Sequence, residues 1–217
     1  MRMEDPAHSS TGILGVQLRG DDGRVTRSCA RFPKPHHLVF RAMGLDRIVP
    51  GLVPRHFMTE WDHGTNCIVD QVPGAFYLVR RSLFDQLAGF DDRFFVYYED
   101  LDFALRAKRV GARCEYLADV FAYHTGQGTS SKVVEQRLVY SSVSKIQYSF
   151  KHFGAFWGCL VLAATLTCEP FARTIWAVGR GQWAELRSTL RASPQLWARG
   201  PRLLVDGLRT GATDWRR

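Results

Sequence analysis

Three carboxylates, at Glu99, Asp100 and Asp102, stand close together in the middle of the chain. They follow the aromatic run 94–98 and open a stretch, 101–110, whose apolar residues recur at helical spacing, so we expect them at a helix N-terminus. The free N–H groups of such a terminus stabilise carboxylates, and on one interpretation Asp100 is simply a helix cap. On the other, the neighbouring aromatic side chains form a partly apolar cleft in which a carboxylate acts as a general base.

His124 is a second residue whose type could do chemistry. It closes an apolar segment, 120–124, that we expect to be a strand, and sites on open α/β sheets gather at strand ends. The loop 125–131 that follows reads T-G-Q-G-T-S-S. Its glycines and hydroxyls can approach phosphate oxygens closely. A single histidine is also a common structural residue, and both interpretations of His124 stay open.

Between residues 72 and 131 the chain reads V-P-G-A-F-Y-L-V-R-R, then A-G-F-D-D-R-F-F-V-Y-Y-E-D-L-D-F-A-L-R, and later F-A-Y-H-T-G-Q-G-T-S-S. This order resembles the C-terminal half of family 2 glycosyltransferases, especially the bacterial rhamnosyltransferase-like members. The resemblance covers about residues 10–150, and more loosely the apolar C-terminal region. The matching residues are Gly74, Ala75, Arg80, Gly89, Phe90, Asp91, Phe94, Phe95, Tyr97, Glu99, Asp100, Asp102, Arg106, Gly111 and His124.

The resemblance implies an inverting, hexosyltransferase-type enzyme. Asp100 would be the catalytic base, with Glu99 beside it, and would deprotonate an acceptor hydroxyl that attacks the anomeric carbon of a nucleotide-sugar. His124 would be a ligand of a divalent metal, Mg or Mn. The sugar would be rhamnose, and the acceptor a cell-surface polysaccharide or a lipid-linked glycan of cell-wall biosynthesis. The implied substrate-binding residues are Gly74, Ala75, Asp91, Phe94, Arg106 and Ser130.

Asp100-Leu101-Asp102 also spells D-x-D, the motif that in GT-A enzymes binds the metal and the nucleotide diphosphate. That motif normally closes an apolar strand in the N-terminal half, whereas here the sequence enters a helix, so we interpret this D-x-D as coincidental. The nucleotide-binding strands of a complete enzyme are not found in the sequence. We therefore expect an N-terminally truncated chain, and a non-catalytic, membrane-associated remnant of such an enzyme is the alternative function.

The elements that would position these residues alternate between strand and helix patterns, which predicts the α/β class. The resemblance narrows this class to a partial GT-A (Rossmann-like) fold. We expect a partial GT-A domain over 1–130, in which 30–66 is a long irregular connection, and a helical extension over 131–217. The predicted strands are 13–18, 25–29, 67–80, 113–117 and 120–124. The predicted helices are 37–43, 82–88, 101–110, 131–152, 155–178, 182–192 and 195–208.

The net charge of +8 is concentrated near the C-terminus. From residue 173 on, the sequence contains nine Arg and only three acidic residues, Glu185, Asp206 and Asp214. Such a tail implies an anionic partner. No nucleic-acid-binding motif accompanies the arginines, which alternate with apolar and Trp residues, so we exclude a nucleic acid and expect a membrane surface.

The segment 153–168 carries no charge but is short for a spanning helix, which needs about 20 residues. We favour helices lying in the plane of the membrane; a buried helix and a true span are the alternatives. The five Cys form no CxxC pair and the N-terminus has no apolar signal region. These features predict reduced thiols and a peripheral location on the cytoplasmic face of the cell membrane.

Overall fold

The computed structural model of the chain describes residues 3, 5, 8–49, 51, 53–125 and 134–211. The chain divides into two compact units. The first comprises 1–32, 55–92 and 99–128, and the second comprises 33–54, 93–98 and 129–217. The predicted domain boundary at residue 130 lies outside the described residues and stays a prediction.

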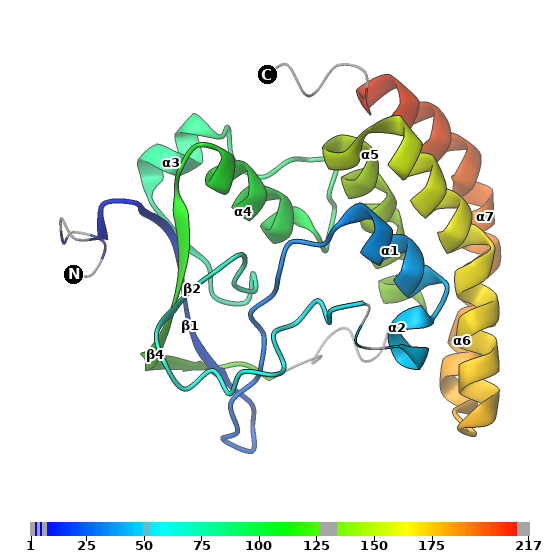
Figure 1. Ribbon diagram of the computed structural model, residues 1–217, viewed down its shortest axis with the longest axis horizontal. Coiled ribbons are helices and arrows are strands. Elements are labelled where there is room, and N and C mark those ends of the chain that lie inside the picture. Colours follow the sequence, from blue (N-terminus) through cyan, green and yellow to red (C-terminus); the bar gives the residue numbers. More distant parts are fainter. Residues whose placement is uncertain are drawn as a thin grey trace. The chain divides into compact units, whose positions relative to one another are not determined.

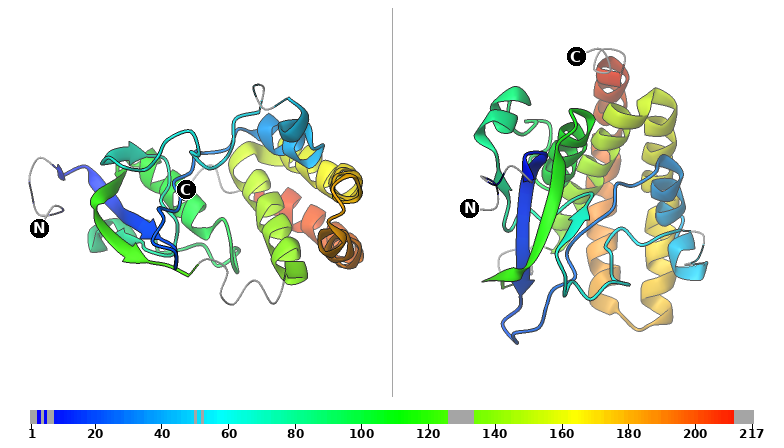
Figure 2. Two further views of the ribbon diagram at one scale, coloured as in Figure 1. Left: turned by 90° about the horizontal axis from the view of Figure 1, so that it is seen from below. Right: turned by 60° about the vertical axis from the view of Figure 1, so that its left-hand side comes forward.

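The first unit is built on a four-stranded sheet with the order β2-β4-β1-β3. The strands are β1 (Thr11–Arg19), β2 (Cys67–Val69), β3 (Leu78–Val79) and β4 (Arg113–Tyr123). β1 and β4 are parallel and lie side by side in Figures 1 and 2, whereas β2 and β3 pair antiparallel at the two edges. The predicted α/β class is therefore confirmed, and so are strands within 67–80 and 113–124.

Two strand predictions need correction. The segments 113–117 and 120–124 form one strand, β4, whose pairing with β1 shifts register between Val16 and Gln17. The predicted strand 25–29 is wrong, because only an isolated bridge joins Val25 to Arg19. At the end of this segment the chain no longer pairs with β1, and the N–H of Cys29 instead donates to Nε2 of His63 (3.2 Å).

Helices α3 (Arg81–Gln86) and α4 (Glu99–Arg109) pack against the sheet in the first unit. Phe103, Ala104 and Ala107 of α4 are buried in one cluster with Ile13 of β1 and Tyr116 of β4. Both helices agree with the predicted ones to within a few residues. Because its apolar face is anchored on the sheet, α4 holds the acidic residues of its first turn in a fixed place.

His63 anchors the long connection 30–66, for which the sequence predicted no regular structure beyond the helix 37–43. Its ring is fully buried, stacks on Trp61 at 4.2 Å between centroids, and lies edge-on to Tyr116. Nε2 accepts the Cys29 N–H, while Nδ1 lies 3.0 Å from the Trp61 carbonyl, so the neutral ring donates from Nδ1. Burial lowers the pKa of His63, and a charged ring would turn Nε2 into a second donor facing the Cys29 N–H.

We expect acid to destabilise the first unit through His63. Because the folded-state pKa is depressed, the unfolded chain binds the proton first. The contribution of the ring is complete above about pH 6.5 and is lost as pH falls, by at most about 1.4 kcal/mol per pH unit. Urea unfolding at pH 7.5 and 5.5 measures this loss. His63→Gln, which keeps a donor and an acceptor, should show a smaller loss than the unmodified protein; an equal loss in both would contradict the assignment.

The second unit is helical in all its described elements. It contains α1 (Pro35–Ala42), α2 (Leu45–Ile48), α5 (Val134–Leu166), α6 (Cys168–Gly179) and α7 (Trp183–Gly211), which Figure 1 shows together. Its core joins Leu38 of α1, Ile146, Phe150 and Val161 of α5, and Leu203 of α7. α1 confirms the helix predicted around 37–43.

The C-terminal helices divide as predicted at one place and differently at two others. The predicted boundary between 131–152 and 155–178 coincides with a kink in α5 at Gly154, whose φ of 79° and ψ of 177° suit only glycine. The predicted helix 155–178 is itself divided, because α5 ends at Leu166 and α6 begins at Cys168. The predicted break between 182–192 and 195–208 is wrong, because α7 runs through Pro194 and Pro201. Buried side chains on both sides of Pro194, at Ala192 and Leu196, hold the two halves of α7 in one cluster with Val139 of α5.

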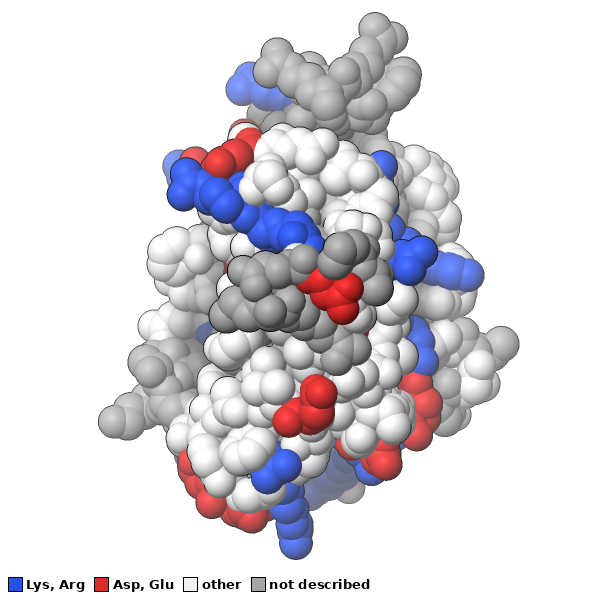
Figure 3. Space-filling view, turned by 90° about the vertical axis from the view of Figure 1, so that its left-hand side faces the viewer, with Lys and Arg blue, Asp and Glu red and all other residues white. Residues whose placement is uncertain are grey.

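The surface charge and the apolar C-terminal stretch both bear on the membrane predictions. Figure 3 shows a face on which Lys and Arg side chains alternate with Asp and Glu between uncharged residues, so the positive excess is not gathered there. Within the described residues, the stretch Val134–Gly179 is long and apolar enough to cross a membrane, on length and composition alone. The membrane predictions for the C-terminal region stay open.

Candidate functional site

Asp100 lies in the first turn of α4, where the sequence placed it. Its Oδ1 accepts the N–H of Leu101 (2.8 Å) and its Oδ2 accepts the N–H of Gly74 (2.9 Å) from the turn before β3. The Tyr77 hydroxyl donates to the backbone carbonyl of Asp100 (3.3 Å). The carboxylate thus does more than cap the helix, because Gly74 binds it from a distant part of the chain.

The surroundings of Asp100 suit a proton acceptor. Burial raises the pKa of its carboxyl, against the opposing effect of the donors from Gly74, Leu101 and the Gln71 side chain. Gly74, Ala75 and Phe76 are exposed, and Asp100 itself is half-buried, so solutes reach its neighbourhood. A half-buried carboxylate with a raised pKa and access to solutes is the arrangement that general bases use.

Glu99, predicted to act beside Asp100, is also half-buried. Burial, with a further contribution from the Asp100 charge, raises the pKa of its carboxyl. Its Oε2 is buried and has no hydrogen-bond partner among the described residues. Each raised pKa means that the carboxyl holds its proton to a higher pH than an exposed carboxyl does, which suits acid–base chemistry.

Asp102, in contrast, forms an ion pair within the protein. Its side chain is fully buried and pairs with Arg106 one turn along α4 (2.8 Å). Arg106 also donates to the carbonyls of Leu87 (2.7 Å) and Gly89 (2.8 Å), beyond the end of α3. The interpretation of Asp100-Leu101-Asp102 as a coincidental D-x-D agrees with this pairing. The substrate role of Arg106 stays a prediction, while its contacts show a structural one.

His124 follows β4 at the carboxyl edge of the parallel pair. It is exposed, and its N–H donates to the carbonyl of Arg19 (2.9 Å), the last residue of β1, which ties the ends of the two strands together. The Thr125 hydroxyl donates to Asp21 (2.8 Å) at this edge. His124 therefore lies at a strand end, as predicted. No hydrogen bond or ion pair joins it to Asp100 among the described residues, and the predicted shared cleft stays a prediction.

The remaining predicted residues fall in different places. Gly74 and Ala75 form the exposed turn above Asp100, and Asp91 is half-buried in the loop between α3 and α4. Phe94 belongs to the second unit, where it is buried and Lys151 lies over its ring (5.6 Å). Ser130 lies outside the described residues. The substrate roles of these residues stay predictions.

Gln71 and Tyr77 are the neighbours of Asp100 that sequence reasoning missed. Gln71 is buried and its side chain donates toward the Asp100 carboxyl. Tyr77 packs against Phe90 and Phe103 while its hydroxyl reaches Asp100. Both lie in a segment that the sequence marks only as strand material. The alternation of polar and apolar residues there carries no sign of a contact with a helix more than twenty positions away.

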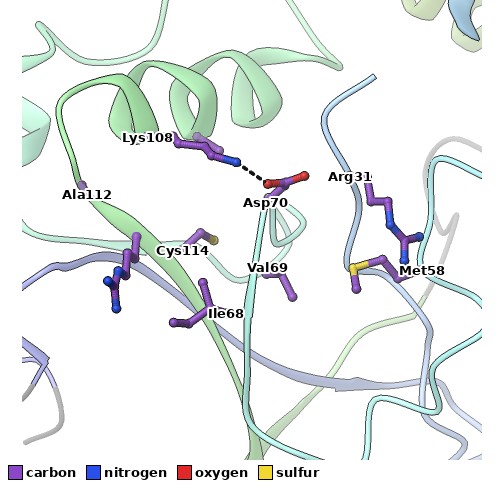
Figure 4. A pocket seen from close by; sticks show the side chains of 10 residues that line it. Arg31, Met58, Ile68, Val69, Asp70, Lys108, Ala112 and Cys114 are labelled. Atoms are coloured by element: carbon purple, nitrogen blue, oxygen red, sulfur yellow. Dashed lines mark hydrogen bonds and ion pairs between the residues drawn. The ribbon is translucent and has the colours of Figure 1, made fainter. Parts of the chain in front are cut away.

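A cavity of about 270 Å³ lies elsewhere in the first unit, between α4 and strands β2 and β4 (Figure 4). Figure 4 shows Lys108 pointing at Asp70, and the two form an ion pair (2.9 Å). Burial raises the pKa of the Cys114 thiol, which lines the cavity, to about 12, so no thiolate nucleophile is present there. None of the predicted site residues that the structure describes lines this cavity.

A divalent metal would need several ligands held close together. Within the described residues, no group of three or more His, Cys, Asp or Glu side chains is arranged to hold a metal ion. His124 would therefore contribute a single ligand, and the described side chains do not form a complete metal site. The divalent metal stays a prediction.

Comparison with known proteins identifies the family. The family described as Glycosyl transferase family group 2 matches residues 55–197, which include α4 and β4. The chain is 30% identical over 118 residues to the N-acetylglucosaminyl-diphospho-decaprenol L-rhamnosyltransferase of Mycobacterium tuberculosis, a match that covers 52% of this chain and 37% of the relative.

Two further relatives are similar over shorter stretches. The chain is 40% identical over 60 residues to the rhamnosyltransferase WbbL of Escherichia coli, covering 28% of this chain and 23% of that protein. It is 31% identical over 77 residues to a low-salt glycan biosynthesis hexosyltransferase of Haloferax volcanii, covering 36% and 22%. The matches thus span less than two-fifths of each relative's length. No solved structure is significantly similar to the chain.

Proposed function

The chain belongs to glycosyl transferase family group 2, and we propose that it forms the acceptor-side, catalytic-base part of an inverting glycosyltransferase of GT-A type. The observation that carries the proposal is the environment of Asp100. Its carboxylate is half-buried at the start of α4, is held by the N–H groups of Gly74 and Leu101, and has a pKa raised by burial.

The proposed reaction needs one base at this position. Asp100 takes the proton of an acceptor hydroxyl as the hydroxyl oxygen forms a bond to the anomeric carbon of a nucleotide-sugar. The bond from that carbon to the diphosphate oxygen breaks, and the nucleoside diphosphate leaves with the electron pair. Attack from the face opposite the leaving group inverts the configuration. The N–H groups of Gly74 and Leu101 keep the carboxylate oriented throughout.

The donor and acceptor are proposed from the relatives. Two of them are named rhamnosyltransferases, and one name contains a diphospho-decaprenol, a lipid-linked acceptor. We therefore propose rhamnose as the sugar, and a lipid-linked glycan or a cell-surface polysaccharide as the acceptor. Mg or Mn, with His124 as one ligand, is part of the same proposal; His124→Ala should then weaken binding of Mn²⁺, which electron paramagnetic resonance measures without any turnover.

A transfer assay tests this function. The protein is incubated with nucleotide-linked rhamnose, glucose or galactose and with a lipid diphosphate that carries N-acetylglucosamine, and mass spectrometry detects the added sugar. Transfer that prefers the rhamnose donor supports the proposal. Saturation-transfer NMR on the same mixtures reports binding separately: acceptor binding without transfer favours the non-catalytic remnant, whereas binding of neither substrate would reject both functions.

The membrane is the proposed working surface. Exposed apolar residues on α6, at Phe171, Ile175 and Val178, share the C-terminal region with its arginines, a combination that suits a peripheral position on an anionic, cytoplasmic membrane face. We expect the protein to float with anionic vesicles at low salt and to be partly released at high salt, because salt screens the arginine charges. Protein that stays in the soluble fraction at low salt would contradict this location.

A further inference from the structure

A second cavity, of about 220 Å³, lies within the helical unit. Helices α1, α2, α5 and α6 each contribute side chains to its wall, and Tyr98 completes it. We call it the helical-unit cavity. Cationic residues outnumber acidic ones in this wall by four to two: they are Arg41, Arg47, Lys145 and Arg173, against Asp46 and Glu169.

Two of the cations are neutralised within the protein. Lys145 binds Oε2 of Glu169 (2.5 Å), and Arg173 binds Oε1 of Glu169 (3.1 Å) and Oε1 of Glu185 (3.3 Å). Burial alone would raise the pKa of Glu169, but the charges of Lys145 and Arg173 outweigh it and lower that pKa. These two cations and two carboxylates balance, so they need no further counter-ion.

Arg41 has no such partner. Its guanidinium donates to the carbonyl of Pro54, and no carboxylate lies within ion-pair distance of it among the described residues. Burial lowers the pKa of Arg41, and the nearby Tyr98 and Asp46, which act in the opposite direction, do not offset it. A desolvated guanidinium without a counter-ion is costly, and an anion that entered the cavity would remove that cost.

Arg47 lies at the exposed side of the same cavity. Its guanidinium is 5.4 Å from the centre of the Trp176 ring, and Arg180 approaches the same ring to 4.4 Å. No ion pair of Arg47 with a carboxylate occurs among the described residues, so the aromatic ring holds this guanidinium in place while its N–H groups remain available. Arg41 and Arg47 together provide the fork-shaped donors that phosphate oxygens accept.

Helix α6 also presents an apolar surface next to the cavity. Phe171, Ile175 and Val178 recur at spacings of four and three residues, so they lie on one side of the helix, and they are 70%, 70% and 50% exposed. Ala172, the neighbour of Phe171, lines the cavity. An anion held beside an apolar helix face is the arrangement that a lipid phosphate would meet.

We propose that the helical-unit cavity binds a phosphate group in ester linkage, with Arg41 and Arg47 as its main ligands. The phosphate is that of a membrane lipid headgroup or of a soluble phosphate ester, because the two share the chemistry that these arginines recognise. Asp100 does not line this cavity, and the proposal does not involve sugar transfer, so its test is separate from the test of the proposed function.

The test measures binding with two probes. Isothermal titration calorimetry with glycerol 3-phosphate covers the soluble source, and flotation with vesicles of phosphatidylcholine containing phosphatidic acid covers the lipid source. We expect Arg41→Gln to weaken binding of at least one probe by about tenfold or more, because a charge-assisted pair is lost. Arg41→Lys keeps the positive charge but loses the fork-shaped guanidinium, so its affinity should lie between that of the unmodified protein and that of Arg41→Gln.

Arg24→Gln is the matched control, since it removes one exposed positive charge from the other unit. Arg47→Gln serves as the second variant, because Arg47 is exposed and its loss should not affect folding. Loss with glycerol 3-phosphate identifies a soluble ligand, and loss with vesicles alone identifies a lipid headgroup. If neither probe binds the unmodified protein, or if Arg41→Gln and Arg47→Gln bind both probes as well as Arg24→Gln does, the proposal is overturned.

Discussion

Asp100→Asn should reduce sugar transfer by about 10²–10⁴-fold while the protein stays folded. The amide has nearly the shape of the carboxylate and still accepts an N–H from Gly74 or Leu101, so α4 keeps its position. It cannot take a proton from the acceptor hydroxyl. Initial rates of transfer and a urea unfolding curve, measured on the same preparation, separate the two effects.

The matched control is Asp85→Asn on α3. Asp85 is an exposed carboxylate that pairs with Arg81, so its loss removes the same charge without touching Asp100. The pH profile adds a second readout. Because burial raises the pKa of Asp100, transfer should fall with acid at a pH above the usual range for aspartate, and Asp100→Asn should lack this limb. Near-normal transfer by Asp100→Asn would leave Asp100 as a helix cap only.

The part of the site that lies in short, regular segments could be predicted from the sequence. Helical periodicity over 101–110 placed Asp100 in the first turn of α4, and the apolar run before His124 placed that residue at a strand end. Both inferences use local rules, in which side-chain spacing follows directly from the period of the backbone. The structure confirms both positions.

The contacts between distant segments could not be predicted in the same way. Gln71 and Gly74 reach Asp100 because the turn before β3 packs over the start of α4, and nothing local in the sequence reports that packing. The strand expected over 25–29 failed for a related reason. The backbone N–H of Cys29 donates to His63 and its carbonyl accepts the N–H of Met58, and a single sequence does not reveal these residues as partners.

Proline shows how tertiary packing can override a local rule. The Ser193-Pro194 pair predicts a helix end, since a residue before proline avoids the helical conformation. α7 nevertheless continues, because Ala192 and Leu196 are buried in a cluster with Val139 of α5. The same packing brings Gly207 so close to Phe150 that a β-carbon there would lie 2.5 Å from the ring. Long helices of the second unit are thus specified by their partners more than by their own propensities.

The ion pair of Asp102 and Arg106 leads to the largest expected loss of stability. Arg106→Met removes the counter-ion of a carboxylate that is 0% exposed and leaves the carbonyls of Leu87 and Gly89 without their donor. Breaking a buried ion pair by removing one of its partners typically costs about 3–5 kcal/mol of the free energy of unfolding. Urea unfolding monitored by circular dichroism measures this cost.

Arg81→Met is a closely matched control. Arg81 and Asp85 are also four residues apart on a helix and also 2.8 Å apart, but their side chains are 87% and 56% exposed. Water already solvates both charges there, so stability should change very little. The contrast isolates burial as the cause. Equal losses in Arg106→Met and Arg81→Met would show that the helical pair itself, and not its burial, determines the cost.

A double-mutant cycle measures how strongly the contributions of Asp102 and Arg106 to stability depend on each other. Asp102→Asn removes the charge that Arg106 compensates, so adding Arg106→Met to it should cost less than Arg106→Met costs alone. The difference is the coupling between the two side chains. Since Arg106 joins α4 to the segment after α3, a large coupling would mean that this pair sets the orientation of α4 and, with it, the place of Asp100. Additive losses would assign the stability to the carbonyl contacts of Arg106 instead.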